Sequence, residues 1–436
     1  MRSLLASLRR VLFWSHLTLG VVAGLVILLM SITGVLLGFE RQTIAWLDGA
    51  PRVEAPAGVE RLPLDALLAG AGIDAAEVAS VAMRADPAEP VTVRFRDRER
   101  GTVLLDPWRG GTVAPPADSA GRKAMAALRR WHRWVGAEGG EWRARMKATT
   151  GASNLAFLLI VLSGLWLWWP KRLTWTAIRN VAWFRRGLSP KARDFNWHNT
   201  IGFWTAIPLF FVVASGVFIS YRWPGLWLDR VAGNAEERAA AIEALAATPE
   251  PARDGGSGGG GTRGGAESRG GRERGGPEER TDTPSRPRAS LQAIAAAAAA
   301  ARPDWQSLTI TTPSPRDSVV TVAAAAGNTY RPDLRTTLRF DAETAALAGA
   351  TGYADLSVSR RIRAWVRFGH TGEVFGLTGQ WIATIASLGG VFLVLTGLAL
   401  SVRRLASWWR RRRTTPERTT GPGPKRSAPE PVAGVV

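Results

Sequence analysis

Histidine is the residue type with the clearest chemical potential in this chain of 436 residues. There are only four histidines, no cysteine and five methionines, so histidine is nearly the only available ligand for a transition metal or a haem iron. The histidines each stand at the entry to a different long apolar stretch; they are His16, His132, His198 and His370. One histidine at a helix end could simply cap the helix or reach the interface, but one for each of four stretches predicts a ligand set.

The four apolar stretches are long enough to cross a bilayer, which requires about 20 helical residues. They comprise residues 11–39, 148–169, 197–221 and 377–402, and none contains an acidic residue. The first is too long for the apolar region of a signal peptide, and no small-residue cleavage site follows it, so we expect a retained membrane helix. The sequence therefore predicts an α-helical membrane protein built on a four-helix transmembrane bundle.

The basic residues predict how the chain is oriented. Segments 1–10, 170–196 and 403–436 together carry 19 basic and 3 acidic residues, which is +16 of the formal net charge of +20. Because short basic segments stay in the cytoplasm, these three segments should be cytoplasmic, and 40–147 and 222–376 should lie outside. We therefore expect a multi-pass protein of a bacterial inner membrane with both termini cytoplasmic. The charge is divided among membrane flanks, so the bilayer, and not a nucleic acid, is the expected partner.

A repeated pattern of small residues accompanies the histidines. His16 is followed by Gly20 and Thr33-Gly34, and His198 by Gly202 and Ser215-Gly216. The other two spans contain comparable pairs, Ser163-Gly164 and Thr396-Gly397. Small residues let membrane helices approach closely, and glycine at a fixed spacing from a histidine could also make room for a macrocycle. Both roles, helix packing and space for a ring, remain open from the sequence.

The two outer segments contain a second repeat. Residues 62–113 and 290–349 each predict a short helix, two or three strands and a turn headed by an aspartate, Asp106 or Asp341. We interpret these aspartates as turn formers, and the two segments as two small α+β lobes. Residues 250–288, which are mainly Gly, Arg, Glu, Pro and Ser, have no apolar period and are predicted to be a disordered insertion.

Together these features resemble the PepSY-associated transmembrane family, bacterial inner-membrane proteins linked to iron uptake. The matching motifs are Ser15-His16 with Gly20 and Thr33-Gly34, Leu104-Leu105-Asp106-Pro107, Trp131-His132-Arg133-Trp134, the run from Ser163 to Pro170, Trp197-His198-Asn199 with Gly202, and the run from Gly369 to Gly376. The resemblance covers about residues 8–404. The departures are Arg109-Gly110, where the family favours Thr-Gly, and the 250–288 insertion. The resemblance implies periplasmic PepSY lobes, four core helices and, as in the family's ferric-siderophore reductases, two b-type haems.

Topology independently predicts how the histidines pair. His16 and His198 enter their spans from the cytoplasmic side, whereas His132 and His370 precede spans that enter from outside. Pairing across the membrane would have to bridge much of its roughly 30 Å hydrocarbon core, so we expect one pair on each face. Two axial histidines leave no open coordination position on a haem iron, which favours electron transfer. Since there is no cysteine, a covalent c-type haem and a thiolate-held iron–sulfur cluster are excluded.

Arginines lie close in sequence to the outer histidines. Arg133 adjoins His132, and Arg363 and Arg367 precede His370. They could pair with haem propionates; the alternative is that they are solvated interfacial arginines.

The predicted function is a haem-dependent ferric-chelate reductase of the inner membrane. Electrons would pass through two b-type haems to a periplasmic acceptor, most simply a ferric siderophore, and no side chain beyond the haem ligands is expected to be catalytic. No Gly-x-Gly-x-x-Gly follows a predicted strand, so the donor should be a separate cytoplasmic reductase or a quinol. Two alternatives stay open: a component of an iron, metal or siderophore permease, and a membrane-anchored PepSY protein that regulates or binds a partner without redox activity.

Overall fold

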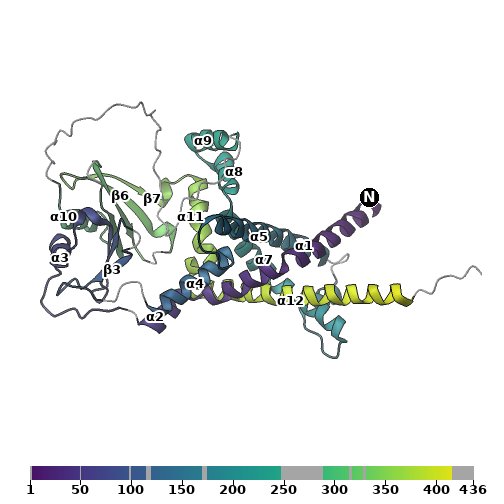
Figure 1. Ribbon diagram of the computed structural model, residues 1–436. Helices are drawn as coiled ribbons and strands as arrows, with labels where there is room; N and C mark the ends of the chain where they lie inside the picture. Colours follow the sequence, from purple (N-terminus) through teal and green to yellow (C-terminus); the bar gives the residue numbers. More distant parts are fainter. Residues whose placement is uncertain are drawn as a thin grey trace, which may run out of the picture.

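The computed structural model describes residues 2–49, 51–97, 100–113, 119–168, 174–246, 288–313, 317–327 and 330–414. A bundle of long helices forms one end of the molecule and an antiparallel sheet forms the other (Figure 1). The predicted insertion at 250–288 lies outside the described residues except for its last residue, as do Trp169 and the part of the basic tail beyond 414.

Within the described ranges, four helices are long and apolar enough to cross a membrane: α1 (Arg2–Leu37), α5 (Gly140–Trp168), α7 (Pro190–Ser220) and α12 (Gly376–Thr414). They contain nearly all of the four predicted spans, and they extend beyond them at their polar ends. The chain is thus a multi-pass membrane protein. Pro208 lies inside α7 without ending it, as expected where neighbouring helices support the backbone.

The four long helices pack as a square. Both α1 and α7 pack against α5 and against α12, which puts α1 and α7 at opposite corners. Ile27, Leu209 and Ala386 are buried between them, whereas Val22 and Ile207 are largely exposed on the outside of the bundle. Apolar side chains on the outer face are what a helix bundle in lipid requires.

Shorter helices connect the bundle to the sheet. Helix α4 (Ala120–Trp134) precedes α5 and packs on α1, and α11 (Val358–Thr371) precedes α12 and packs on α7. Both begin at a serine that accepts a backbone N–H of the first turn, Ser119 and Ser357. The remaining helices are α2 (Glu40–Asp48), α3 (Leu64–Gly70), α6 (Trp175–Ala182), α8 (Trp223–Ala232), α9 (Ala235–Ala246) and α10 (Leu291–Ala301), with 3₁₀ turns at Ala75–Glu77, Pro332–Leu334, Tyr353–Asp355 and Glu373–Phe375.

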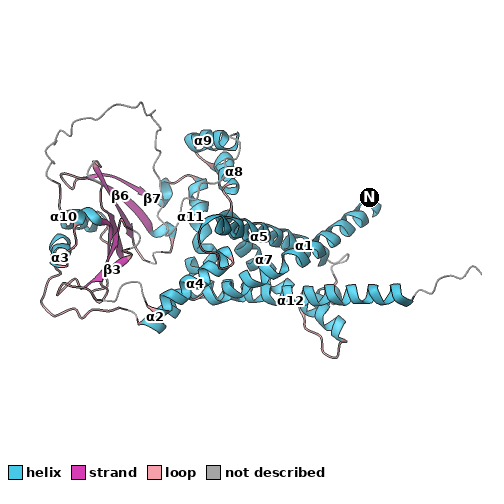
Figure 2. Cartoon of the chain, viewed as in Figure 1, coloured by secondary structure: helices cyan, strands magenta, loops and turns pink. Residues whose placement is uncertain are grey.

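Seven strands form one antiparallel sheet in the order β3-β2-β1-β4-β5-β6-β7 (Figure 2). The strands are β1 (Val78–Arg84), β2 (Val91–Phe95), β3 (Thr102–Leu105), β4 (Ser307–Thr311), β5 (Val319–Ala325), β6 (Arg335–Asp341) and β7 (Leu347–Gly352). The first three come from one predicted lobe and the last four from the other, and β1 pairs with β4 with Val81 opposite Ile310. Both predicted α+β units are therefore present, but they are the two parts of one sheet with one apolar core under α3 and α10.

The order of elements is repeated along the chain. Residues 2–168, here called the first half, run from a long helix through strands to a short helix and a second long helix. Residues 190–414, the second half, do the same with α7, β4–β7, α11 and α12. The two aspartates predicted to form turns do so: Asp106 accepts the backbone N–H of Trp108 at 2.8 Å, and Asp341 that of Thr344 at 2.9 Å.

Candidate metal centres

The structure brings the four histidines together in the two pairs that topology predicts. The ring centroids of His16 and His198 lie 6.4 Å apart with an interplanar angle of 80°. Those of His132 and His370 also lie 6.4 Å apart, at 60°. All four imidazoles are half-buried. We call the first pair the inner pair and the second the outer pair.

This spacing fits a single metal ion between the two rings. An imidazole nitrogen lies about 2 Å from a first-row metal ion, so two imidazoles on opposite sides of one ion have centroids about 6 Å apart. Among the described residues no group of three or more His, Cys, Asp and Glu is placed to hold an ion. A bare ion would need further protein ligands. A macrocycle that brings its own nitrogen ligands, as haem does, would need only two imidazoles from the protein, and each pair could supply them.

Each histidine makes the same second contact, from its Nδ1 to a serine or threonine hydroxyl on a neighbouring helix. The contacts join His16 to Ser163 at 3.0 Å, His132 to Thr33 at 2.9 Å, His198 to Thr396 at 2.9 Å and His370 to Ser215 at 3.0 Å. These hydroxyls are the first members of the four Ser/Thr-Gly pairs that recur in the sequence. The repeated pair thus marks the position that orients each imidazole.

The direction of these hydrogen bonds identifies the free ring nitrogen. Thr33 donates its hydroxyl hydrogen to the carbonyl of Leu29 at 2.7 Å, so it can only accept from His132. For His370 the carbonyl of Val212 lies 2.9 Å from Nδ1 and can act only as an acceptor. Nδ1 therefore carries the proton and Nε2 keeps its lone pair, which is the tautomer that ligates a metal through Nε2.

Burial also favours the neutral form of the outer pair. Desolvation, and next the neighbouring His370, lower the pKa of His132 to about 4. Burial likewise lowers the pKa of His370. A neutral imidazole is the form that binds a metal, so the outer pair is ready to bind one at neutral pH.

The glycines beside the hydroxyls make room for the imidazole rings. A Cβ on Gly164 would lie 3.3 Å from the Cε1 of His16, and one on Gly397 would lie 3.4 Å from that of His198. Gly216 differs, because its Cβ would meet the amide of Asn154 on α5 at 2.8 Å, so this glycine serves helix packing. Of the two roles that the sequence left open, helix packing is confirmed at Gly216, and room for a macrocycle stays a prediction.

Gly20 lies one turn after His16 and faces open space. A Cβ there would meet no atom of the described residues within 4 Å. Helix packing among the described residues therefore does not account for Gly20, and the space beside it is open to a ring that His16 would hold. On α7 the corresponding Gly202 has the side chain of Leu393 at 3.5 Å. The inner pair thus has free space on its α1 side.

Helices α1 and α7 connect the two pairs. Each carries one inner histidine and, 17 residues later, one hydroxyl of the outer pair, so the pairs are separated by about 26 Å along these helices. His132 reaches Thr33 because α4 folds back along α1. The end of α4 is fixed by the hydroxyl of Thr150 on α5, which donates to the Arg133 carbonyl at 2.8 Å. The outer pair therefore lies level with the last turns of α1 and α7.

The three arginines predicted near the outer pair differ in their partners. Arg363 forms an ion pair with the buried carboxylate of Asp229. Arg133 and Arg367 are exposed and have no carboxylate partner among the described residues. Desolvation, and then the nearby cations Arg143, Arg367 and Arg129, lower the pKa of Arg133. Arg133 thus stands in a positive field beside the outer pair, where an anionic group such as a propionate would be stabilised.

The sequence did not identify two kinds of site residue. The hydroxyls are visible in the sequence as part of a repeat of small residues, but their contacts with the histidines could not be predicted, because the partners lie 99 to 198 residues away. Arg222, which lies near Arg363 and Arg367 at a cavity, carried no signal of its own.

Comparison with known families agrees with this architecture. The family described as PepSY-associated TM region matches residues 13–421 of the chain. No curated protein is significantly similar to it.

Proposed function

The chain belongs to the PepSY-associated TM region family, and from that premise we propose that it is a di-haem oxidoreductase that passes electrons across the membrane. One b-type haem would be held by His16 and His198, and a second by His132 and His370. The observation that carries this proposal is the repeated site geometry: two imidazoles 6.4 Å apart, each with its Nδ1 hydrogen bonded to a hydroxyl.

The protein residues would have three tasks. The histidines would hold the haem iron through Nε2, and a haem held by two histidines would supply one-electron transfer. The four hydroxyls fix the tautomer and the ring orientation. Arg133 would neutralise a propionate at the outer pair, where its own carboxylate partner is missing among the described residues.

The proposed direction of transfer is outward. The described parts of the basic segments, residues 2–10, 174–196 and 403–412, flank the ends of α1, α5, α7 and α12 that lie away from the sheet (Figure 1). By the positive-inside rule that end is cytoplasmic, so the inner pair would receive electrons and the outer pair, beside the sheet, would deliver them. The donor would be a separate cytoplasmic reductase or a quinol.

We propose a ferric siderophore or another ferric chelate as the periplasmic acceptor. Reduction to Fe(II) weakens the binding of hard oxygen ligands, which would release the iron. The proposal for the acceptor rests on the family resemblance and on the outer pair's position at the sheet end of the bundle.

The haem content of the full-length protein tests this function. Protein from haem-replete cells should be red, with a reduced b-type spectrum and two haems per chain by pyridine haemochrome assay. Replacing either inner histidine, as in His16→Ala, should remove one haem, and His132→Ala should remove the other. Colourless wild-type protein would refute the proposal and leave the permease and the non-redox PepSY protein as the remaining candidates.

A second measurement addresses the acceptor. Haem reduced in proteoliposomes should be reoxidised by a ferric chelate added outside, with Fe(II) trapped by a chromophoric chelator. If the haems bind but no ferric chelate reoxidises them, the electron-transfer site stands and the acceptor assignment is wrong.

A further inference from the structure

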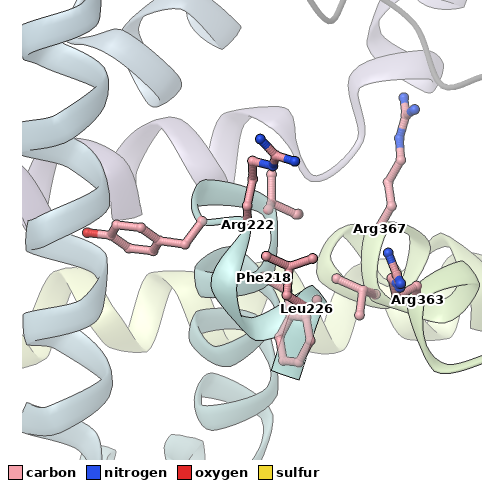
Figure 3. Close-up of a pocket in the computed structure, with 9 residues that line it drawn as sticks. Phe218, Arg222, Leu226, Arg363 and Arg367 are labelled. Carbon is pink, nitrogen blue, oxygen red and sulfur yellow. The ribbon is translucent and has the colours of Figure 1, made fainter. Parts of the chain in front are cut away.

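A cavity of about 380 Å³ lies outside both histidine pairs, where α7, α8 and α11 meet. Its wall is divided into an apolar and a cationic part. The apolar part consists of Phe218, Ile219, Leu226 and Val366, and the cationic part of Arg222, Arg363 and Arg367. Figure 3 shows Arg222, Phe218 and Leu226 on one side of the cavity and Arg363 with Arg367 on the other.

The positive charge around this cavity is mostly uncompensated. Asp229 pairs with Arg363 and also accepts a hydrogen bond from Ser359, so one carboxylate serves three arginines. Arg222 and Arg367 have no carboxylate partner in the part of the chain that the structure describes. Two arginines that line one cavity and lack a carboxylate partner are suited to recognise an anion.

The cavity lies at the level of the membrane surface. Phe218 and Ile219 belong to the last turn of the α7 span, and Arg222 follows directly after its end. Helix α8 continues from there with Trp223 and Trp227 exposed one turn apart, as expected for a helix that lies in the interfacial region. The arginines are therefore at the depth of lipid phosphates, and the apolar wall is at the depth of the upper acyl chains.

We propose that this cavity binds the phosphodiester headgroup of an anionic phospholipid. The guanidinium groups of Arg222 and Arg367 would hold the phosphate oxygens by paired N–H donors, and Phe218, Leu226 and Val366 would contact the glycerol and the first acyl carbons. An anionic phospholipid suits this cavity because its phosphate would meet the cationic wall and its acyl carbons would meet the apolar wall. A soluble anion would leave the apolar wall unused.

The site would also connect the lipid to the outer pair. Val366 and Arg367 precede His370 by four and three residues on α11, so they lie on the same face one turn away. A lipid phosphate held there would fix the helix that carries this histidine. The lipid site itself does not depend on the haem proposal, because no haem ligand lines the cavity.

Native mass spectrometry of the full-length protein tests the proposal. The protein is equilibrated in micelles of phosphatidylcholine with increasing phosphatidylglycerol, and retained lipids are counted. Wild type should retain one phosphatidylglycerol in preference to phosphatidylcholine, and Arg222→Gln should weaken this about tenfold, the loss expected for one charge-assisted hydrogen bond. Arg238→Gln on α9, an exposed arginine that does not line the cavity, is the matched control and should bind like wild type.

Three results would overturn the proposed lipid site. The first is equal retention of phosphatidylcholine, and the second is unchanged binding by Arg222→Gln in protein that elutes as a single folded species. The third is displacement of the lipid by inorganic phosphate or ferric citrate at comparable concentrations, which would assign the cavity to a soluble anion. A separate haem assay on the same samples distinguishes these outcomes from failure of the proposed redox function.

Discussion

Removing the Thr33 hydroxyl should change the redox potential of the proposed outer haem. In Thr33→Val the shape is nearly kept, but His132 loses the acceptor 2.9 Å from its Nδ1. A strong hydrogen-bond acceptor at Nδ1 makes the imidazole a better electron donor to the metal, and this favours the ferric state. Its loss should therefore raise the potential.

The size of the change follows from the hydrogen bond. A net contribution of about 1 kcal/mol corresponds to about 40 mV for one electron. This is an upper bound, because the bond is also present in the ferrous state and because the carbonyl of Met30 remains as a second acceptor for His132. We expect an increase of about 20–40 mV.

The assay is a spectroelectrochemical titration in the background His16→Ala, in which only the outer haem would remain. Thr384→Val is the matched control, since its buried hydroxyl also lies in the bundle but has no hydrogen-bond partner among the described residues. It should leave the potential unchanged. Equal shifts in the two variants, or a lower potential in Thr33→Val, would refute the assigned tautomer and the role of the hydroxyls.

Three further predictions concern the supporting structure. Gly20→Leu should fold, because no described residue has an atom within 4 Å of a Cβ at Gly20, but it should lower the content of the proposed inner haem and not of the outer one, as measured by haemochrome assay. Asp48 accepts hydrogen bonds from Ser119 and from the first N–H groups of α4, and these bonds lower its pKa below 3.8. The ionised carboxylate therefore stabilises the fold above pH 3.8. This stabilisation is lost as the pH falls through the lower pKa of the folded state. The difference in melting temperature between wild type and Asp48→Asn should accordingly be largest near neutral pH and disappear in acid. Gly216→Ala should destabilise the bundle by about 1–3 kcal/mol, because its Cβ would lie 2.8 Å from the Asn154 amide. Adding Asn154→Ala should recover part of this loss, as measured by chemical unfolding. If the effects of the two changes simply add in the double variant, the contact between the two residues is contradicted.

Much of the membrane part could be predicted from the sequence, because an uninterrupted run of about 20 apolar residues is typical of a helix that crosses a bilayer. The pairing of the histidines followed from which side of the membrane each span enters. The contact between Thr33 and His132 could not be predicted, because it depends on α4 folding back along α1. Helix α4 itself was not recognised: its charged and aromatic sequence is typical of a surface helix and equally of a loop.

The sheet was predicted in its parts but not as a whole. Alternation at Val91–Phe95 and at Val319–Val322 is visible in the sequence, and both are strands. The pairing of β1 with β4 joins strands more than 200 residues apart, and no local pattern specifies that register. β1 was not identified separately because alanine and serine interrupt its alternation. Two lobes were therefore expected where the two repeats share one sheet.

Each pair takes one histidine from each half of the chain, and this affects the order in which the pairs form during biosynthesis. Neither half alone contains a complete pair, so a nascent or truncated chain that ends within the first half has imidazoles without opposite partners. During synthesis the inner pair becomes complete when His198 has been inserted, and the outer pair only after a further 172 residues, at His370. At about 5–20 residues per second this is a delay of roughly 10–30 s. Under the proposed function, cofactor loading would thus proceed in a fixed order along the molecule, and the outer site that would deliver electrons would be assembled last.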